Sequence, residues 1–264
     1  MSDLLRPAAR GAAQAWYTEP ERRRVARAVD SRLSRIARRL AFEVALDRLD
    51  REPERVLDAG CGDGEGLEDL RARLPDATLI GLEPEPGMAA LAEQRLGDDV
   101  LVVRDAAGPG RLGWVNADLV LCHLTLALWD EPVAGLQGMA EALAPAGLLY
   151  VVDLAGDALA EPAVRAALLS AARTDPERRF LEAQADASYT SAEIAQLCRL
   201  AGLHAADVAV GGLGGAAIEG PTARSLYARN PLVRRIVAEI AAQPGLGADG
   251  AASVAHVFWQ RPSA

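Results

Sequence analysis

Lysine is absent from this sequence, because all 28 basic residues among the 264 are arginine. Aromatic residues make up only 4% of the chain, and there are three histidines and three cysteines. The cysteines (Cys61, Cys122 and Cys198) have no CxxC spacing and no histidine cluster beside them, so the sequence indicates neither a disulfide framework nor a metal site. We therefore expect a reducing, cytoplasmic setting.

Long apolar runs are missing as well. The longest, such as those at residues 119–121 and 148–152, fall far short of the ~20 residues needed to span a bilayer. The N-terminus, MSDLLRPAAR, lacks the charged-then-apolar layout of a signal peptide. We expect a soluble protein without a membrane partner.

The formal net charge is −9 and the isoelectric point is near 5.0, which argues against a general nucleic-acid binder. The charge is uneven, since residues 1–55 hold 13 arginines against nine acidic residues and the rest of the chain holds 15 against 28. The N-terminal segment is therefore chemically distinct. We expect an N-terminal helical lid or cap at residues 1–50 and a main domain at residues 51–264.

Apolar residues between positions 20 and 49 recur every three or four positions, which predicts an amphipathic helix: Val25, Val29, Leu33, Ile36, Leu40 and Val44. Arginines between residues 22 and 39 decorate its other faces. We interpret them as the solvated face of a packed helix, with a substrate-facing or membrane-surface role as the alternatives. Asp30 and Ser31 could cap a second helix and divide the first.

The middle of the chain alternates β-branched or leucine-rich runs with helical patterns. Strands are expected at residues 55–58, 78–83, 100–105, 118–122 and 148–153, and helices at 66–74, 87–96 and 132–143. This alternation predicts an α/β fold with a parallel sheet buried on both faces. In open sheets of this kind, ligands bind at the carboxyl ends of the strands.

The last part of the chain continues the pattern with a long interruption. Residues 156–173 are expected to form a helix, and the segment from Thr190 to Glu193 has the capping-box spacing for a helix that ends near Gly202. Two more strands are expected at 206–210 and 253–260. Between them lie a glycine-rich loop at 211–220 and a helix at 222–242, which together form a helical insert at about 211–250.

A glycine-rich turn directly follows the first strand, where residues 56–64 read VLDAGCGDG. Glycines let the backbone approach a ligand closely, and the N-terminus of the next helix offers free N–H groups. Taken alone the pattern is weak, since nicotinamide-dinucleotide enzymes use a related loop. Two carboxylates make the glycine-rich pattern more specific. Glu83 ends the second strand, where it can bind two ribose hydroxyls, and Asp105 ends the third, where it can accept a hydrogen bond from the amino group of adenine.

With these features the chain resembles the class I S-adenosylmethionine-dependent methyltransferases over residues 56–202. The segments that carry the resemblance are, in order, VLDAGCGDG, GLEPEPGMAALA, VVRDAA, ADLVLCHLTLALWDEP, ALAPAGLLYVVDL and YTSAEIAQLCRLAGL. The resemblance implies a Rossmann-like, doubly wound seven-stranded sheet, mostly parallel with an antiparallel last strand. It also implies S-adenosylmethionine as cofactor and S-adenosylhomocysteine as product. The chain departs from the family at Ala146, where glycine is common, and in the long insert.

The resemblance further implies the two ends of a cofactor site. Gly60 and Gly62, on either side of Cys61, would contact the methionine part through their backbone, with Asp58 beneath the loop reaching its amino group. Glu83 would hold the ribose.

At the other end of this site, Pro84 and Met88 would lie against the adenine ring. Asp105 and the amide of Ala106 would bind the amino group of the ring. The alternatives are that Met88 is a simple core residue and that Asp105 only caps a turn.

Methyl transfer is an in-line displacement at an electrophilic methyl group, so the protein mainly supplies proximity, alignment and a dry pocket. His123 follows the fourth strand, where the resemblance places the cofactor sulfur and the acceptor. It is a candidate cofactor-site residue and a candidate catalytic base for a hydroxyl or amine acceptor, or it only shapes the pocket. The segment after this strand lacks the Asn/Asp-Pro-Pro-Tyr pattern of nucleobase amino-methylating members, which disfavours that reaction.

Four aromatic residues are candidates for the acceptor site. Trp16 and Tyr17 precede the arginine-rich helix and could form a lid over the cofactor, and Trp129 and Tyr189 could line the acceptor pocket. Packing is the alternative for each of them. His204 and His256 have no identifiable partners in the sequence, and we interpret both as structural.

The leading hypothesis is a methyltransferase that acts on a small molecule of specialised metabolism. The alternatives are a methyltransferase that holds RNA or an acidic protein on its arginine-rich face, a related fold that binds S-adenosylmethionine without transferring methyl, a degenerate binding subunit, and a nicotinamide oxidoreductase. The acceptor, the methylated atom and the oligomeric state stay open, and a homodimer through the extra helix is one option.

Overall fold

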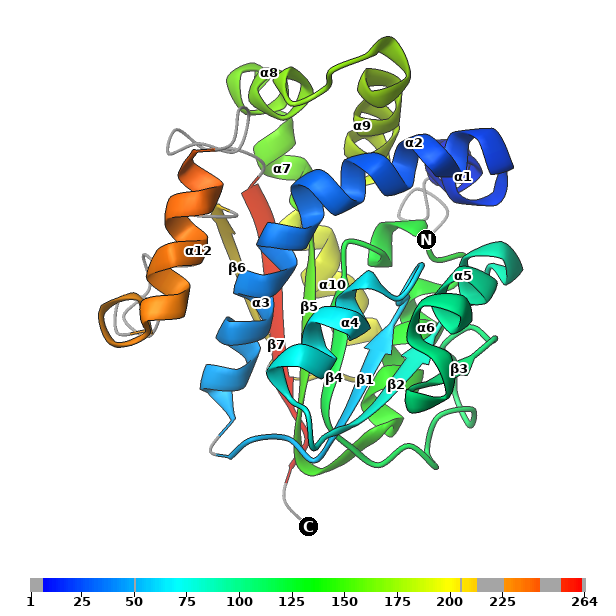
Figure 1. Cartoon of the computed structure of the whole chain (residues 1–264), viewed down its shortest axis with the longest axis vertical. Helices are drawn as coiled ribbons and strands as arrows, with labels where there is room; N and C mark the ends of the chain where they lie inside the picture. The colour runs from blue at the N-terminus through cyan, green and yellow to red at the C-terminus, as the bar shows by residue number, and fades with distance from the viewer. Residues whose placement is uncertain (1–6, 50, 205, 213–225, 243–252, 263–264) are drawn as a thin grey trace.

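The sheet has the order expected of a doubly wound fold. The computed structural model describes residues 7–49, 51–204, 206–212, 226–242 and 253–262. In this part of the chain, seven strands form one sheet in the order β3-β2-β1-β4-β5-β7-β6 (Figure 1). Their bounds are β1 Arg55–Ala59, β2 Thr78–Leu82, β3 Leu101–Val103, β4 Ala117–His123, β5 Leu143–Leu154, β6 Asp207–Gly212 and β7 Ser253–Gln260. Only β7 runs antiparallel to its neighbours, which confirms the predicted sheet.

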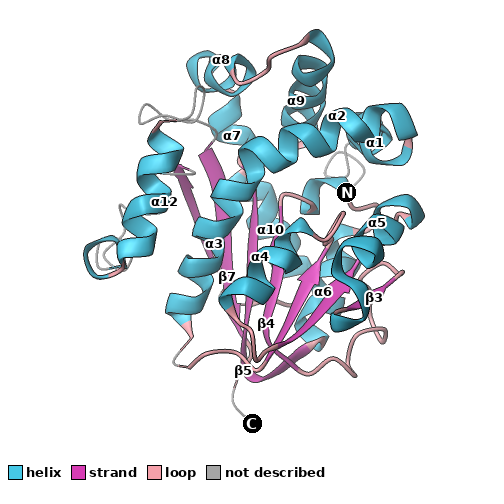
Figure 2. Ribbon diagram, viewed as in Figure 1, coloured by secondary structure: helices cyan, strands magenta, loops and turns pink. Residues whose placement is uncertain are grey.

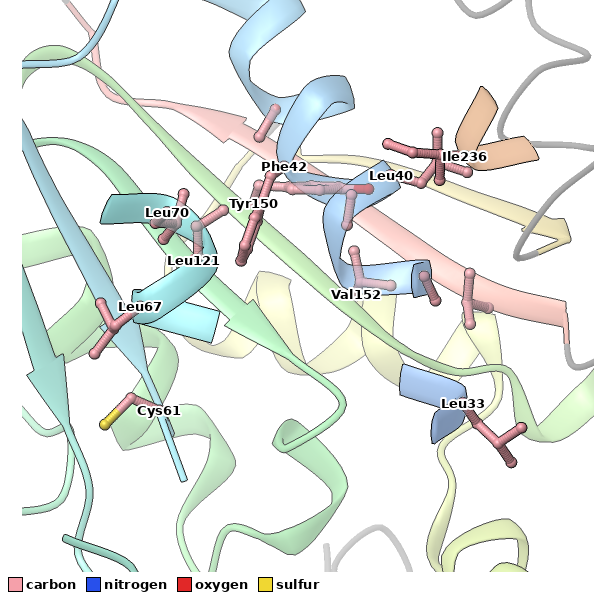
Figure 3. Close-up of a cluster of buried hydrophobic side chains, with 14 of the residues drawn as sticks. Leu33, Leu40, Phe42, Cys61, Leu67, Leu70, Leu121, Tyr150, Val152 and Ile236 are labelled. Atoms are coloured by element: carbon pink, nitrogen blue, oxygen red, sulfur yellow. The ribbon is translucent and has the colours of Figure 1, made fainter. Parts of the chain in front are cut away.

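The strands are buried on both faces because their side chains alternate between two apolar cores. In β4, Leu119 and Leu121 enter one core, whereas Val120 and Cys122 enter the other. Figure 3 shows part of the first core, in which Leu40, Leu70 and Tyr150 come from three different elements. His256 lies in this region as well, where its Nδ1 and the hydroxyl of Tyr150 are 2.8 Å apart, in line with its structural interpretation.

Helices cover both faces of the sheet (Figure 2). On one side lie α3 Arg35–Arg48, α4 Glu65–Arg73 and α5 Pro86–Leu96, and α12 Pro231–Ala241 packs on α3. On the other side lie α6 Pro132–Glu141 and α10 Ser191–Leu200. The predicted capping box is present at the start of α10, since Thr190 and Glu193 bond reciprocally. The 3-10 turns η3 Gly97–Asp99 and η4 Leu126–Leu128 complete these connections.

A further group of helices gathers at the carboxyl ends of the parallel strands. It consists of α1 Pro7–Thr18, α2 Pro20–Val29, α7 Gly156–Leu159, α8 Pro162–Ser170 and α9 Asp175–Ala187. Both α1 and α2 pack on α9. The continuous helix predicted for residues 156–173 is wrong, because Pro162 starts a new helix there and Thr174 caps the next.

The predicted division of the N-terminal helix is also wrong. A π turn at Asp30–Ser34 connects α2 to α3 without a break, and the side chains of Asp30 and Ser31 cap no helix. Both side chains bond elsewhere instead. Asp30 accepts hydrogen bonds from Tyr17 and Ser34, and Ser31 donates one to Glu65.

Strand β5 begins earlier than expected, with an irregular register against β4 near its start. Ala146 adopts a left-handed φ of 63° in this segment. This conformation favours glycine, which explains why the family commonly has glycine there. Most of the predicted insert, residues 213–225 and 243–252, lies outside the described residues. In the described part of the chain, no helix combines the length and apolar character that crossing a membrane requires.

Candidate functional site

A cavity of about 740 Å³ opens at the carboxyl ends of β1, β2 and β4. One side is formed by the glycine-rich turn, the end of β2 and residues 106–109. The other side is formed by residues 123–134 and by side chains from α1, α2, the π turn and α3. Its volume is typical of a small-molecule site.

The glycine-rich turn is shaped by backbone conformations that suit glycine. Gly60, Gly62 and Gly64 have φ values of 83°, 58° and 80°. The amides of Gly60 and Cys61 donate to the carbonyl of Leu82 at 2.8 and 3.1 Å, which fixes the turn to β2. A Cβ at position 60 would come within 2.4 Å of Thr125, so this turn packs closely against the loop after β4.

Glu83 connects the turn to the end of β2. One of its carboxylate oxygens accepts from the amide of Gly62 at 3.0 Å, and the other accepts from the amide of Glu85 at 2.9 Å. The side chain is buried, and desolvation raises the pKa of this carboxyl to about 7 despite the two hydrogen bonds. A carboxylate has further lone pairs, so Glu83 can still accept hydrogen bonds from a ligand in the cavity.

Asp58 lies at the end of β1 beneath the turn and lines the same cavity. Its side chain is 5% exposed and has no hydrogen-bond partner among the described residues. Burial raises its pKa to about 6, and the charge of Arg38 acts in the opposite direction. A buried carboxylate without a hydrogen bond suits a cationic ligand group such as an ammonium.

The predicted adenine end is only partly assembled. Met88 is buried beside Gly62, and Met88, Pro84 and Ala106 all line the cavity. Asp105 does not line it. Its carboxylate forms an ion pair with Arg111 and accepts from the amide of Ala106 at 2.8 Å, so this structure places both groups of the predicted amino-group site in a surface turn.

His123 stands at the end of β4 and lines the cavity. Its Nε2 is buried and has no hydrogen-bond partner within the described residues. Burial, together with the charges of Arg38 and His256, lowers the pKa of His123 well below its ordinary value. The ring is therefore neutral at physiological pH, and its role as catalytic base or as pocket wall stays a prediction.

The loop after β4 is held by residues that the sequence analysis missed. The buried carboxylate of Asp153, at the end of β5, accepts from the amides of Ala127 and Leu154 at 3.0 and 2.8 Å. Thr125 accepts a hydrogen bond from the indole of Trp129 at 2.6 Å. An acidic residue at the end of a buried strand was the available signal for Asp153.

Comparison with known proteins agrees with this geometry. A family model described as a methyltransferase domain matches residues 57–149. Among characterised relatives, malonyl-[acyl-carrier protein] O-methyltransferase of Dechloromonas aromatica is 32% identical over 175 residues, which are 66% of this chain and 60% of that protein. Trans-aconitate 2-methyltransferase of Methylobacterium nodulans is 36% identical over 103 residues, 38% of each chain. The chain thus matches between 38% and 60% of the length of these two relatives.

Among solved structures, the plantazolicin methyltransferase BpumL in complex with S-adenosylhomocysteine has the same fold, with a TM-score of 0.79 at 22% identity, over 98% of this chain and 97% of that one. The plantazolicin methyltransferase BamL, in complex with a triazolic desmethyl analogue and S-adenosylhomocysteine, gives a TM-score of 0.77 at 25% identity over 96% of each chain. In the matched segment and in its fold, the chain is similar to the class I S-adenosylmethionine-dependent methyltransferases.

The cofactor of this family is S-adenosylmethionine, and the cavity of this methyltransferase fits it. Asp58 offers a carboxylate without a hydrogen bond for the ammonium group, and Glu83 offers lone pairs for the ribose hydroxyls. The backbone of Gly62 is open to the cavity because no Cβ covers it. These assignments of single residues stay predictions.

The four aromatic candidates for the acceptor site of the methyltransferase divide into two pairs. Tyr17 and Trp129 line the cavity, whereas Trp16 and Tyr189 do not. Trp16 packs edge-on against Phe180 of α9, with centroids 5.7 Å apart, and Tyr189 is 2% exposed in the second apolar core. The rings of Trp16 and Tyr189 are buried in the protein away from the cavity lining, which favours the packing alternative for both.

The arginines of the N-terminal helices form ion pairs, and the side chains of Arg22 and Arg24 stay exposed to solvent, with that of Arg35 partly exposed. All eight between residues 22 and 39 have an acidic partner: Arg22 with Glu19, Arg23 with Glu85, Arg24 with Glu21, Arg27 with Asp63, Arg32 with Glu177, Arg35 with Asp69, Arg38 with Glu65 and Arg39 with Glu239. Most of these partners belong to the main domain. The positive charge of the segment thus holds it on the acidic body of the methyltransferase.

Asp30 is a cavity residue that the sequence analysis did not identify as such. The hydroxyl of Tyr17 donates to its carboxylate at 3.2 Å, and that of Ser34 at 3.4 Å. Desolvation raises the pKa of Asp30 to about 6, and the charge of Arg38 opposes this shift. No pattern in the sequence indicated that Asp30 enters the cavity, because its position depends on the π turn.

Proposed function

We propose that this protein transfers a methyl group from S-adenosylmethionine to a small molecule or short peptide of specialised metabolism. The observation that carries the proposal is a single cavity with two unlike halves. The half formed by the glycine-rich turn and Glu83 suits the cofactor, and the half formed by the N-terminal helices and residues 123–134 is left for an acceptor.

The N-terminal helices bridge this cavity and would exclude water from it. Gln14 of α1 donates to the carbonyl of Leu128 at 2.6 Å, and Arg23 of α2 pairs with Glu85 at 3.1 Å. The two contacts lie on opposite sides of the cavity. We therefore propose that residues 1–50 act as the lid of the main domain.

Methyl transfer requires the chain mainly to position the acceptor relative to the cofactor. The cofactor supplies an electrophilic methyl group, so the chain needs to align the acceptor and keep the site dry. His123, neutral and buried, would shape the wall near the reacting atoms. The loop from Thr125 to Trp129, which Asp153 holds from behind, would fix the position of the acceptor.

The related proteins support this acceptor class. By their names, two of them methylate trans-aconitate and malonyl-[acyl-carrier protein], and a third is a plantazolicin methyltransferase in complex with a triazolic desmethyl analogue. A macromolecular acceptor held by the arginines is disfavoured, because all eight of them between residues 22 and 39 are already paired. We also propose a cytoplasmic location, which the three free cysteines favour.

Two measurements test the proposal. Isothermal titration should detect binding of S-adenosylhomocysteine but not of NAD. Incubation with S-adenosylmethionine and a set of candidate metabolites and short peptides should give products that are heavier by one CH₂. Binding without any methylated product would favour the alternative of a related fold with another reaction, and binding of NAD instead would refute the proposal.

A further inference from the structure

The acceptor half of the cavity has a polar character of its own, and the following argument rests on the proposed methyl transfer. Once Asp58 and Glu83 are assigned to the cofactor, Tyr17, Asp30 and His123 are among the polar groups that remain near the lid. Other polar side chains that line this half are Gln14, Thr18, Ser31, Ser34, Arg38, Thr125, Asp130 and Glu131. Apolar side chains of Leu124, Leu128 and Trp129 accompany them. This half therefore suits an acceptor that has both a polar group and an apolar part.

In the described part of the chain no salt bridge pairs the carboxylate of Asp30, and Arg38, whose charge opposes the rise that burial causes in the pKa of Asp30, forms its own salt bridge with Glu65. Three guanidinium groups line the cavity, and each is neutralised by a carboxylate: Arg27 by Asp63, Arg38 by Glu65 and Arg111 by Asp105. Asp30 differs from these carboxylates. In the described part of the chain its hydrogen-bond partners are two hydroxyl groups, at 3.2 and 3.4 Å, and it forms no salt bridge.

The hydrogen-bonding capacity of this half also favours a ligand that donates hydrogen bonds. The ionised carboxylate of Asp30 can only accept hydrogen bonds. The Nε2 atom of His123 is buried and has no partner among the described residues, and the neutral ring can accept one. A ligand group with several N–H donors would satisfy both residues, whereas a carboxylate would bring like charge and lone pairs against lone pairs.

The π turn at Asp30–Ser34 directs the side chain of Asp30 into the cavity. Asp30, Ser31 and Ser34 all belong to the π turn, and all three line the cavity. π turns inside α-helices occur frequently at functional sites, because the extra residue changes which side chains face inward. Tyr17, from the neighbouring helix α1, orients the carboxylate through its hydroxyl.

We propose that Asp30, oriented by Tyr17, is the acceptor-binding carboxylate and that the acceptor presents an amine to it. The amine arrives as an ammonium ion, which the carboxylate attracts. One N–H bond must then break so that the nitrogen has a free electron pair, and the proton passes to a carboxylate oxygen of Asp30, where an O–H bond forms. Burial raises the pKa of Asp30 towards that of an ammonium group, which helps this transfer.

This proposal separates the chain from relatives whose names specify an acid as acceptor, such as trans-aconitate. The experiment uses the full chain saturated with S-adenosylhomocysteine and three probes with a common ring: benzylamine, benzyl alcohol and benzoate. Benzylamine should bind about tenfold more tightly than either of the others, the size of a charge-assisted hydrogen bond.

The variant Asp30→Asn keeps the shape and the oxygen that Tyr17 contacts, and it should lower the affinity for benzylamine about tenfold. Its affinity for S-adenosylhomocysteine should stay within about twofold of wild type, which shows that the fold and the cofactor half are intact. Glu21→Gln is the matched control, because it removes one charge from an exposed position of α2 that does not line the cavity and should change neither affinity.

Two sets of results would overturn the proposal. Normal binding of S-adenosylhomocysteine together with equal affinities for the three probes, a preference for benzoate, no binding of benzylamine, or an unchanged Asp30→Asn variant would refute the amine-binding role alone. A wild-type chain that does not bind S-adenosylhomocysteine would refute the proposed function, and the acceptor assignment with it.

Discussion

The carboxylate of Glu83 accepts a hydrogen bond from the amide of Gly62 at 3.0 Å and thereby joins the glycine-rich turn to the end of β2. Its second oxygen holds the amide of Glu85, at the start of α5. One side chain therefore fixes three segments that meet at the cofactor half of the cavity. Changes at this residue should affect ligand binding and local structure together.

The variant Glu83→Gln should weaken the binding of S-adenosylhomocysteine by roughly 1 to 3 kcal/mol, since the ribose hydroxyls lose a charged acceptor. The amide oxygen of glutamine can still accept from Gly62, so the fold should persist. Isothermal titration measures the effect. Glu93→Gln, an exposed acid on α5 that pairs with Arg104, is the control and should bind normally. Equal affinity in both variants would remove Glu83 from the site.

The pKa of Glu83 also predicts a dependence of stability on pH. Burial raises it from 4.5 to about 7, so between these values the folded state keeps a proton that the unfolded chain has released. The stability that this group contributes is present below about pH 4.5 and is lost as the pH rises through 7. Wild type should therefore lose thermal stability relative to Glu83→Gln as the pH increases from 5 to 8. Parallel Tm curves for the two proteins over this range would contradict the raised pKa.

The variant Gly62→Val should abolish binding of S-adenosylhomocysteine. Valine resists the φ of 58°, and its side chain would extend towards Met88 and the cavity. Gly97→Val is the matched control, because Gly97 has a φ of 60° with open space around it. Both variants should lose some stability, but only Gly97→Val should gain Tm on addition of the ligand. A normal ligand-induced gain in Gly62→Val would show that the turn lies away from the ligand.

His123 should stay neutral throughout the physiological range. Its buried ring has a pKa well below the ordinary value, so the imidazole ¹⁵N chemical shifts of this residue should not change between pH 6 and 8. Assignment is made by comparison with His123→Gln. The same variant should leave the pH dependence of kcat in this range unaltered, since a neutral wall residue does not titrate there. A titration of His123 near pH 7 would contradict this prediction and would favour a role as the catalytic base.

Replacement of Ala146 by glycine should stabilise the protein by about 0.5 to 1 kcal/mol. Alanine is strained at the φ of 63°, and the relief exceeds the entropic cost of a glycine in the unfolded chain. Ala144→Gly, two residues earlier in β5, is the control and should destabilise by a similar amount. Chemical denaturation measures both. A loss of stability in both variants would mean that the left-handed conformation costs little here.

The sheet and the glycine-rich turn could be predicted because their signals are local. Buried strands show as apolar runs such as residues 119–121, and the turn requires glycine at fixed positions whatever surrounds it. The ends of the strands then locate Asp58, Glu83 and His123 together, since parallel strands meet at one edge.

The lid side of the site could not be predicted in this way. Trp16 and Tyr189 look like pocket aromatics in the sequence. The ring of Trp16 packs on Phe180 of α9, far away in the chain, and Tyr189 is buried in the second apolar core. At the adenine end, the ion pair between Asp105 and Arg111 could not be predicted either. Asp30 enters the cavity only because the helix contains a π turn, and hydrophobic periodicity does not reveal one extra residue per turn.

The π turn also sets the rotational phase between two halves of one helix. Each residue of an α-helix advances about 100° around the axis, so removal of a single residue from Asp30–Ser34 would rotate α2 by that angle relative to α3. Arg23 and Arg27 would then point away from Glu85 and Asp63, while Arg35 and Arg38 kept their partners on α4. A one-residue deletion in this segment would thus detach the lid without changing any contact of the sheet. The segment therefore tolerates changes in its length less well than its sequence alone indicates.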